Sequence, residues 1–224
     1  MKFTLRFILL SLLVLGCISA PVWADSITVQ NGTFATTNPL NIACGSGCNY
    51  NLGPIPDWTI TAGQAGSWQV GPGYYSLPVP DGGIVALVTN GTISQTLSAH
   101  LIPNTTYTLS VDVGHRLDGF GTTYTLALYA GTTLLNSLSA SSNLIGSGTF
   151  ADETLSYTSG ATVVDSGNLS IVLTSAGSLL ESGGLQSNFA DVQLTDTPEP
   201  SSLLLLGSGL LGVGGFLRRR LLGV

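Results

Sequence analysis

The sequence predicts an all-β protein: a single jelly-roll β-sandwich, preceded by a signal peptide and followed by a transmembrane helix. Three features of the 224-residue chain support this prediction. Apolar and polar residues alternate over many short runs, no run between 25 and 197 keeps a 3.6-residue apolar period for long, and Gly, Asn and Asp clusters separate the runs. Short half-buried strands with frequent turns are typical of β-sandwiches and jelly rolls.

The alternation is clearest in three segments, 107–113, 124–128 and 169–173, which we expect to be strands with one buried face. The stretch 38–73 is rich in Gly, Pro and Asn instead, and we expect long ordered loops there. The turn signals between the expected strands are Asp81-Gly82-Gly83, Asn90-Gly91, Pro103-Asn104, Ala130-Gly131 and Ser166-Gly167-Asn168.

Residues 1–24 have the pattern of a signal peptide. Lys2 and Arg6 form a positive region, 7–16 is an apolar run too short to span a bilayer, and small residues precede a cleavage site after Ala24. One alternative is a loose lipobox ending at Cys17, which would then be lipidated, and another is an uncleaved anchor. We expect signal peptidase to act here and the domain to be exported.

The expected ectodomain, residues 25–196, is strongly acidic. It contains eleven Asp and Glu residues, no lysine and a single arginine, Arg116, which gives a net charge of −10. Phosphate backbones are bound by clustered Lys and Arg, so this composition excludes a nucleic-acid partner. An anionic membrane surface would also repel the domain.

Cys44 and Cys48 are separated by Gly-Ser-Gly, and export provides an oxidising compartment. We predict a disulfide between them, and its short loop should give only a modest gain in stability.

Four side chains are candidates for a ligand site: Trp68, Tyr74, Tyr75 and Arg116. Flat aromatic rings can stack on a sugar, and a guanidinium can donate two hydrogen bonds to a carboxylate or to sugar hydroxyls. The alternative for the aromatic residues is that they anchor loops on the core, as we expect for Trp58. The alternative for Arg116 is a structural ion pair with Asp112 or Asp118.

The C-terminal segment, 197–224, has three parts in order. Pro198-Glu199-Pro200 comes first, then the uncharged run 201–217, then Arg218, Arg219 and Arg220. The 17 uncharged residues are just long enough for a transmembrane helix, and the arginines should stay cytoplasmic, which leaves the domain outside.

This layout resembles the PEP-CTERM sorting signal of Gram-negative bacteria. The resemblance implies recognition by an exosortase, an integral-membrane transpeptidase, and cleavage near Pro198-Glu199-Pro200. We therefore expect an inner-membrane-anchored precursor that becomes a cell-surface or extracellular protein, in association with exopolysaccharide. A plain tail anchor is the alternative.

A second resemblance covers most of the ectodomain. Asn31-Gly32-Thr33-Phe34, the strand 107–114 and the last strand 189–194 are similar to galactose-binding-like jelly rolls, which include many carbohydrate-binding modules. The resemblance implies a glycan ligand and a structural calcium near the first and last strands, for which Asp191 is the one ligand that we name. No cofactor is otherwise expected.

The same strands also resemble the calcium-dependent indole-terpenoid cyclases, through 63–68 and 113–116. That resemblance would imply acid catalysis by a buried carboxyl group. The sequence contains no G-x-S-x-G, H-E-x-x-H, Walker A or EF-hand motif. We therefore expect a non-catalytic, glycan-binding or exopolysaccharide-associated protein, with a cyclase-like enzyme or a purely structural matrix protein as alternatives.

Overall fold

A computed structural model describes residues 24–119, 122–176 and 186–199. The expected signal peptide, transmembrane helix and terminal arginines lie outside these residues. Ala24–Thr197 forms one compact unit. Within the described ranges, no helix has the length and apolar character needed to cross a membrane.

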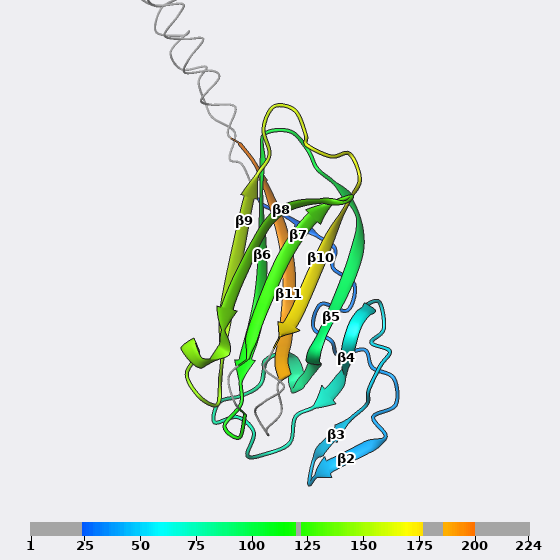
Figure 1. The fold of residues 1–224 in the computed structure, drawn as a ribbon, viewed down its shortest axis with the longest axis vertical. Helices are drawn as coiled ribbons and strands as arrows, with labels where there is room; N and C mark the ends of the chain where they lie inside the picture. The colour runs from blue at the N-terminus through cyan, green and yellow to red at the C-terminus, as the bar shows by residue number, and fades with distance from the viewer. Residues whose placement is uncertain (1–23, 120–121, 177–185, 200–224) are drawn as a thin grey trace, which may run out of the picture. The chain divides into compact units, whose positions relative to one another are not determined.

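The described residues form eleven strands and two short 3-10 turns, Pro80–Gly82 and Ser142–Leu144 (Figure 1). The all-β class is therefore confirmed. The strands are β1 Asp25–Ile27, β2 Ile42–Gly45, β3 Cys48–Tyr50, β4 Thr59–Gln69, β5 Ile84–His100, β6 Thr105–His115, β7 Thr123–Ala130, β8 Thr133–Ser141, β9 Thr149–Thr158, β10 Asn168–Ala176 and β11 Gln186–Pro198.

The long strand β5 belongs to both layers of the fold. Its first half pairs with β11, with Ala86 opposite Phe189, and its second half pairs with β10, with Ile93 opposite Leu173. The two halves meet at Asn90, where the backbone has a positive φ of 42°. One layer is built on β4, β5, β11, β6 and β9, and the other on β5, β10, β7 and β8. We call the surface of the first layer that faces away from the sandwich core its outer face.

β4 lies in the stretch that we expected to be loop. It runs antiparallel to β5 over most of its length, from Thr59 opposite Ser94 to Gln69 opposite Ile84, with two irregularities. The loop prediction was wrong for these residues because the glycines and alanines of β4 hide its alternation. β4 is a strand because it pairs with β5, which lies further along the sequence, and a local residue pattern does not reveal that pairing.

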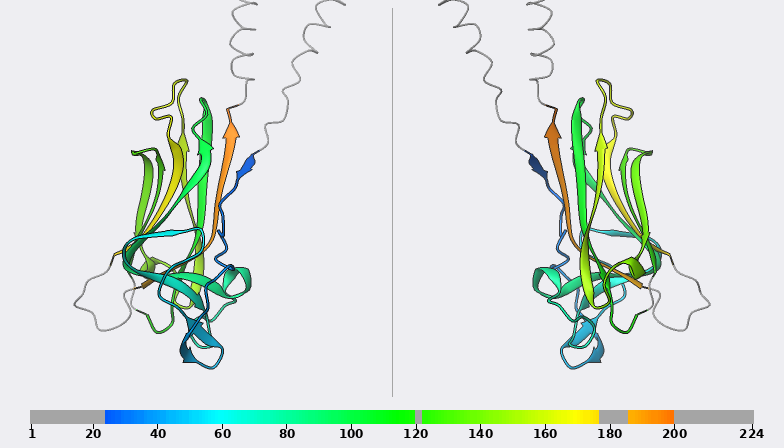
Figure 2. Two further views of the ribbon diagram at one scale, coloured as in Figure 1. Left: turned by 90° about the vertical axis from the view of Figure 1, so that its right-hand side faces the viewer. Right: turned by 90° about the vertical axis from the view of Figure 1, so that its left-hand side faces the viewer.

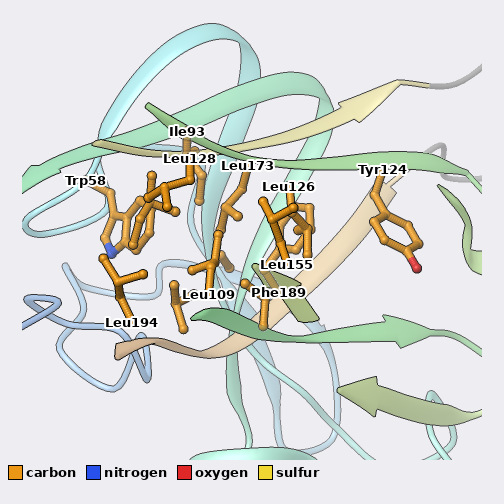
Figure 3. Packing of buried hydrophobic residues seen from close by; sticks show 14 of the residues in the cluster. Trp58, Ile93, Leu109, Tyr124, Leu126, Leu128, Leu155, Leu173, Phe189 and Leu194 are labelled. Carbon is orange, nitrogen blue, oxygen red and sulfur yellow. The ribbon is translucent and has the colours of Figure 1, made fainter. Parts of the chain in front are cut away.

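The inner core lies between the two layers. Figure 3 shows Leu109, Leu126, Leu173 and Phe189 pointing toward one another, and each is 0% exposed. Trp58, which is 5% exposed, is part of the same core, as expected for an anchor. The alternating apolar residues of the three predicted strands all point into this core.

A second, smaller apolar group covers part of the outer face. We call it the outer-face cluster: Cys48, Trp68, Val85, Leu87 and Ala190, with the partly buried Tyr74, Tyr75 and Phe150 packed against it. The segment 70–83 and the β2–β3 hairpin supply its cover.

The first and last strands lie side by side, β1 beside β11 (Figure 2). They are antiparallel, with Asp25 opposite Asp196 and Ile27 opposite Leu194. The beginning and the end of the domain therefore meet at one place.

Candidate functional site

A pocket of about 330 Å³ opens on the outer face, beside the outer-face cluster. Its walls include the aromatic rings of Tyr50, Trp68 and Tyr74, the side-chain amides of Gln64 and Gln186, and one cation, Arg116. The structure thus brings together three of the four candidates from the sequence: Trp68 on β4, Tyr74 in the segment after β4, and Arg116 just after β6.

Trp68 forms a fixed wall of the pocket and is only 2% exposed. Its Nε1 donates to Sγ of Cys48 at 3.2 Å, and its ring meets that of Tyr74 edge-on at 5.0 Å between centroids. The Cys44–Cys48 disulfide is present as predicted, and the backbone oxygen of Cys44 accepts from the Tyr74 hydroxyl at 3.3 Å. The disulfide therefore touches both aromatic residues of this wall.

Arg116 lies against the same two rings. Its guanidinium carbon is 4.9 Å from the Trp68 centroid and 4.8 Å from the Tyr74 centroid, within the range of cation–π contacts. Its Nε and Nη2 donate to the two carboxylate oxygens of Asp118 at 2.8 and 2.6 Å. Arg116 thus makes the expected ion pair, with Asp118, and also lines the pocket.

Tyr75 lies near the pocket but faces the sheet. Its hydroxyl donates to Oδ1 of Asn188 at 2.9 Å, and its ring stacks on Phe150 at 4.5 Å. Gly114 makes this close approach possible, because a Cβ there would lie 2.5 Å from the Tyr75 oxygen. Burial raises the pKa of the Tyr75 phenol, so this hydroxyl stays protonated and remains a donor.

Asn188 was missed by sequence analysis. It immediately precedes Phe189, which points into the inner core, so the alternation of β11 places Asn188 on the outer face. An outward polar residue in a strand looks like an ordinary surface residue. Here Tyr75 covers it, and it is 0% exposed. The sequence does not show this cover.

Among the described residues, no carboxyl group lines the pocket. Hydrogen bonding to Arg116 lowers the pKa of Asp118, so that carboxylate is ionised and is no proton donor near neutral pH. Asp112, on the same face of β6 as Gly114, has its pKa raised to about 6, first by burial and then by the charges of Asp191, Asp152 and Asp81.

Asp191, the expected calcium ligand, lies in β11 near the first strand. Both of its carboxylate oxygens accept from Nε2 of Gln193, at 2.8 and 2.7 Å. Calcium takes six to eight oxygen ligands, and nowhere in the described parts of the chain do three His, Cys, Asp or Glu side chains converge as metal ligands would. Calcium binding at Asp191 stays a prediction, and no step below involves a metal.

The fold and the pocket define the structural class of the protein: an all-β sandwich with an aromatic-walled pocket on one outer face. Within that class, the family model for HpiC1-like proteins, described as HpiC1 cyclase, matches residues 25–195. The chain therefore belongs to the HpiC1-like cyclase family. A second match, the PEP-CTERM protein-sorting motif at residues 196–220, confirms the predicted sorting signal, which implies export and exosortase processing.

Solved structures of cyclases from Fischerella sp. TAU are similar to this chain. The Stig cyclase Fisc in complex with (3Z)-3-(1-methyl-2-pyrrolidinylidene)-3H-indole is 25% identical with a TM-score of 0.62, over 80% of this chain and 99% of its own. A cyclase in complex with 4-(1H-indol-3-yl)butan-2-one is 25% identical with a TM-score of 0.60, over 79% and 98%. No curated protein sequence matches the chain.

The family match overturns one expectation, that the protein is not an enzyme. The expectation rested on missing catalytic motifs, but those motifs belong to hydrolases, metalloenzymes and nucleotide-binding proteins. A cyclase can work by holding one substrate in a reactive shape, and the residues of such a site need not form a short sequence motif.

Proposed function

We propose that this protein is an exported cyclase that binds a flat aromatic, indole-type substrate in the pocket walled by Trp68, Tyr74 and Arg116. The observation that carries the proposal is the family match over nearly the whole ectodomain, together with this pocket on the outer face. The indole ligands of the similar Fischerella cyclases support the substrate class.

Ring closure joins two atoms of one molecule, so the pocket can accelerate it by holding the reactive conformer. The half-buried rings of Tyr50 and Tyr74 present aromatic surface to a planar substrate, and the edge-on contact with Trp68 holds the Tyr74 ring in place. Arg116 and the two glutamine side chains provide hydrogen-bond donors that can bind a polar group of the substrate and so fix its position. Since Asp118 holds the guanidinium by two bonds, the main donor is already oriented when substrate arrives.

Glycan binding, which the sequence suggested, has weaker support. Trp68 is 2% exposed and Arg116 lies over its ring, so its face is not free to stack on a sugar.

The test is a turnover assay with the full-length chain. A panel of indoles that carry an alkenyl side chain would be incubated with it, and products would be sought by liquid chromatography with mass spectrometry as isomers of unchanged mass. We expect Tyr74→Leu to lower kcat/KM by about tenfold, the value of one aromatic contact. Tyr129→Leu, a matched change on β7 outside the pocket, should leave it unchanged.

Absence of any isomeric product with the wild-type protein across the panel would contradict the proposal. So would equal activity of the Tyr74→Leu and wild-type proteins, because the pocket would then not be the reaction site.

A further inference from the structure

The amide of Asn188 carries an unexplained polar atom. The side chain is fully buried, and its Nδ2 has no hydrogen-bond partner among the described residues. Its other end is well satisfied, since Oδ1 accepts from the Tyr75 hydroxyl at 2.9 Å and from Nε2 of Gln186 at 3.3 Å. A buried donor without an acceptor lowers the stability of the fold, and such groups are rare in native proteins.

The position of Asn188 connects it to the pocket. It pairs with Leu87 of β5, and Gln186 lies two residues before it on the same face of β11. Both Leu87 and Gln186 line the pocket. Asn188 is not itself among the described residues that line the pocket, but it lies beside these two residues of its wall, and Tyr75 covers it.

The contacts also fix which end of the amide is free. Oδ1 of Asn188 accepts from the Tyr75 hydroxyl and from Nε2 of Gln186, and Nδ2 is the amide atom without a partner among the described residues. With two donors on the oxygen, the NH₂ group is the end that remains for a ligand.

We propose that Asn188 is a substrate-binding residue whose side-chain NH₂ donates to a carbonyl oxygen or ring-nitrogen acceptor on the substrate. This inference rests on the proposed function and adds to it a requirement on the substrate: a flat aromatic ring must carry an acceptor that reaches Asn188 beside the pocket wall. Tyr75 and Gln186 act as positioning residues that hold the amide oxygen and so orient the donor.

Two indoles that differ only in the acceptor test this directly. The probes are 4-(1H-indol-3-yl)butan-2-one, which carries a ketone, and 3-butylindole, which lacks it. Binding to the full-length chain would be measured by titration calorimetry. We expect the wild-type protein to prefer the ketone by about tenfold or more, because an unpaired buried donor gains a partner only with that ligand.

The variant removes the polar pair as a unit. In Tyr75→Phe/Asn188→Leu no buried hydroxyl or amide is left over from that pair, so we expect the melting temperature to stay the same or rise. The preference for the ketone should disappear. Ser67→Ala is the matched control, because Ser67 also has a buried unpartnered oxygen, on β4 of the same layer, with its side chain on the core side of the sheet.

The outcomes separate the two proposals. If neither indole binds the wild-type protein, the substrate class fails and this inference fails with it. If both bind equally well, or if the double variant keeps the preference, the role of Asn188 is wrong while an indole site stands. A melting temperature that falls by several degrees in the double variant, but not in Ser67→Ala, would show a structural role and overturn the inference as well.

Discussion

The inner core and the outer-face cluster are two apolar regions in contact with the same layer of strands, and they differ in kind. The inner core is mostly aliphatic and fully buried, with Leu109, Leu126 and Phe189 at 0% exposure. The outer-face cluster includes a disulfide-bonded cysteine and an aromatic pair, and beside it lie Arg116 and the buried amide of Asn188, whose Nδ2 has no partner among the described residues. The first region stabilises the fold, and the second is the region where we propose that a ligand binds.

The largest expected effect comes from the inner core. Leu126→Ala should lower the free energy of unfolding by about 2–5 kcal/mol, because it leaves a cavity among side chains that cannot all relax. Urea denaturation of the full chain would measure this. Leu134→Ala, at a residue 49% exposed on β8, should change it by less than about 0.5 kcal/mol. Similar values for the two variants would contradict the role of Leu126 in a closely packed inner core.

A smaller effect is expected at the disulfide. Cys44→Ser should cost about 2 kcal/mol, since the bond closes a loop of only a few residues. It should also weaken binding of 4-(1H-indol-3-yl)butan-2-one, because Trp68 and Tyr74 both contact the bridged cysteines. Dithiothreitol should reproduce the loss in the wild-type protein and have no further effect on the variant. Unchanged binding in both would mean that the bridge does not support the pocket.

The smallest effect concerns pH. The pKa of Asp112 is about 6 in the folded protein, above its ordinary value, so the fold favours the protonated form. Stability should therefore fall as pH rises through the interval from about 4 to 6. Asp112→Asn should remove this loss and raise the melting temperature at pH 7 by ~1–3 °C, a value kept small by solvent screening.

Asp165 provides a control, because its pKa is shifted in the opposite direction from that of Asp112. A hydrogen bond from the Gly167 backbone, and then one from Thr133, lower its pKa, so its charged form is favoured in the fold. Asp165→Asn should lower the melting temperature at pH 7, with the difference vanishing as pH falls below the ordinary carboxyl range. Thermal melts of both variants between pH 3 and 8 would decide: a lower melting temperature for Asp112→Asn at pH 7 would contradict the first assignment, and a higher one for Asp165→Asn would contradict the second.

The sequence predicted what depends on neighbours along the chain. The alternation of β6 is local, and Tyr107, Leu109, Val111 and Val113 all point into the core as expected. The disulfide followed from two nearby cysteines in an exported chain. The sorting motif is a contiguous segment and was found for the same reason.

The missed features depend on contacts between distant segments. β4 became a strand through β5, and Asn188 became a buried residue because Tyr75, 113 positions earlier, covers it. The pocket likewise joins Gln64, Arg116 and Gln186 from three separate parts of the chain. Of the residues that the sequence named as candidates, Trp68, Tyr74 and Arg116 line this pocket, but an enzyme class could not be read from them alone.

The pairing of β1 with β11 has a mechanical consequence. Because Asp25 lies opposite Asp196 in an antiparallel pair, a force that separates the two ends of the domain acts on one rung at a time rather than on all rungs together. The two strands would separate one residue pair at a time, beginning with Asp25 and Asp196, and a small force would suffice to free the chain before Pro198.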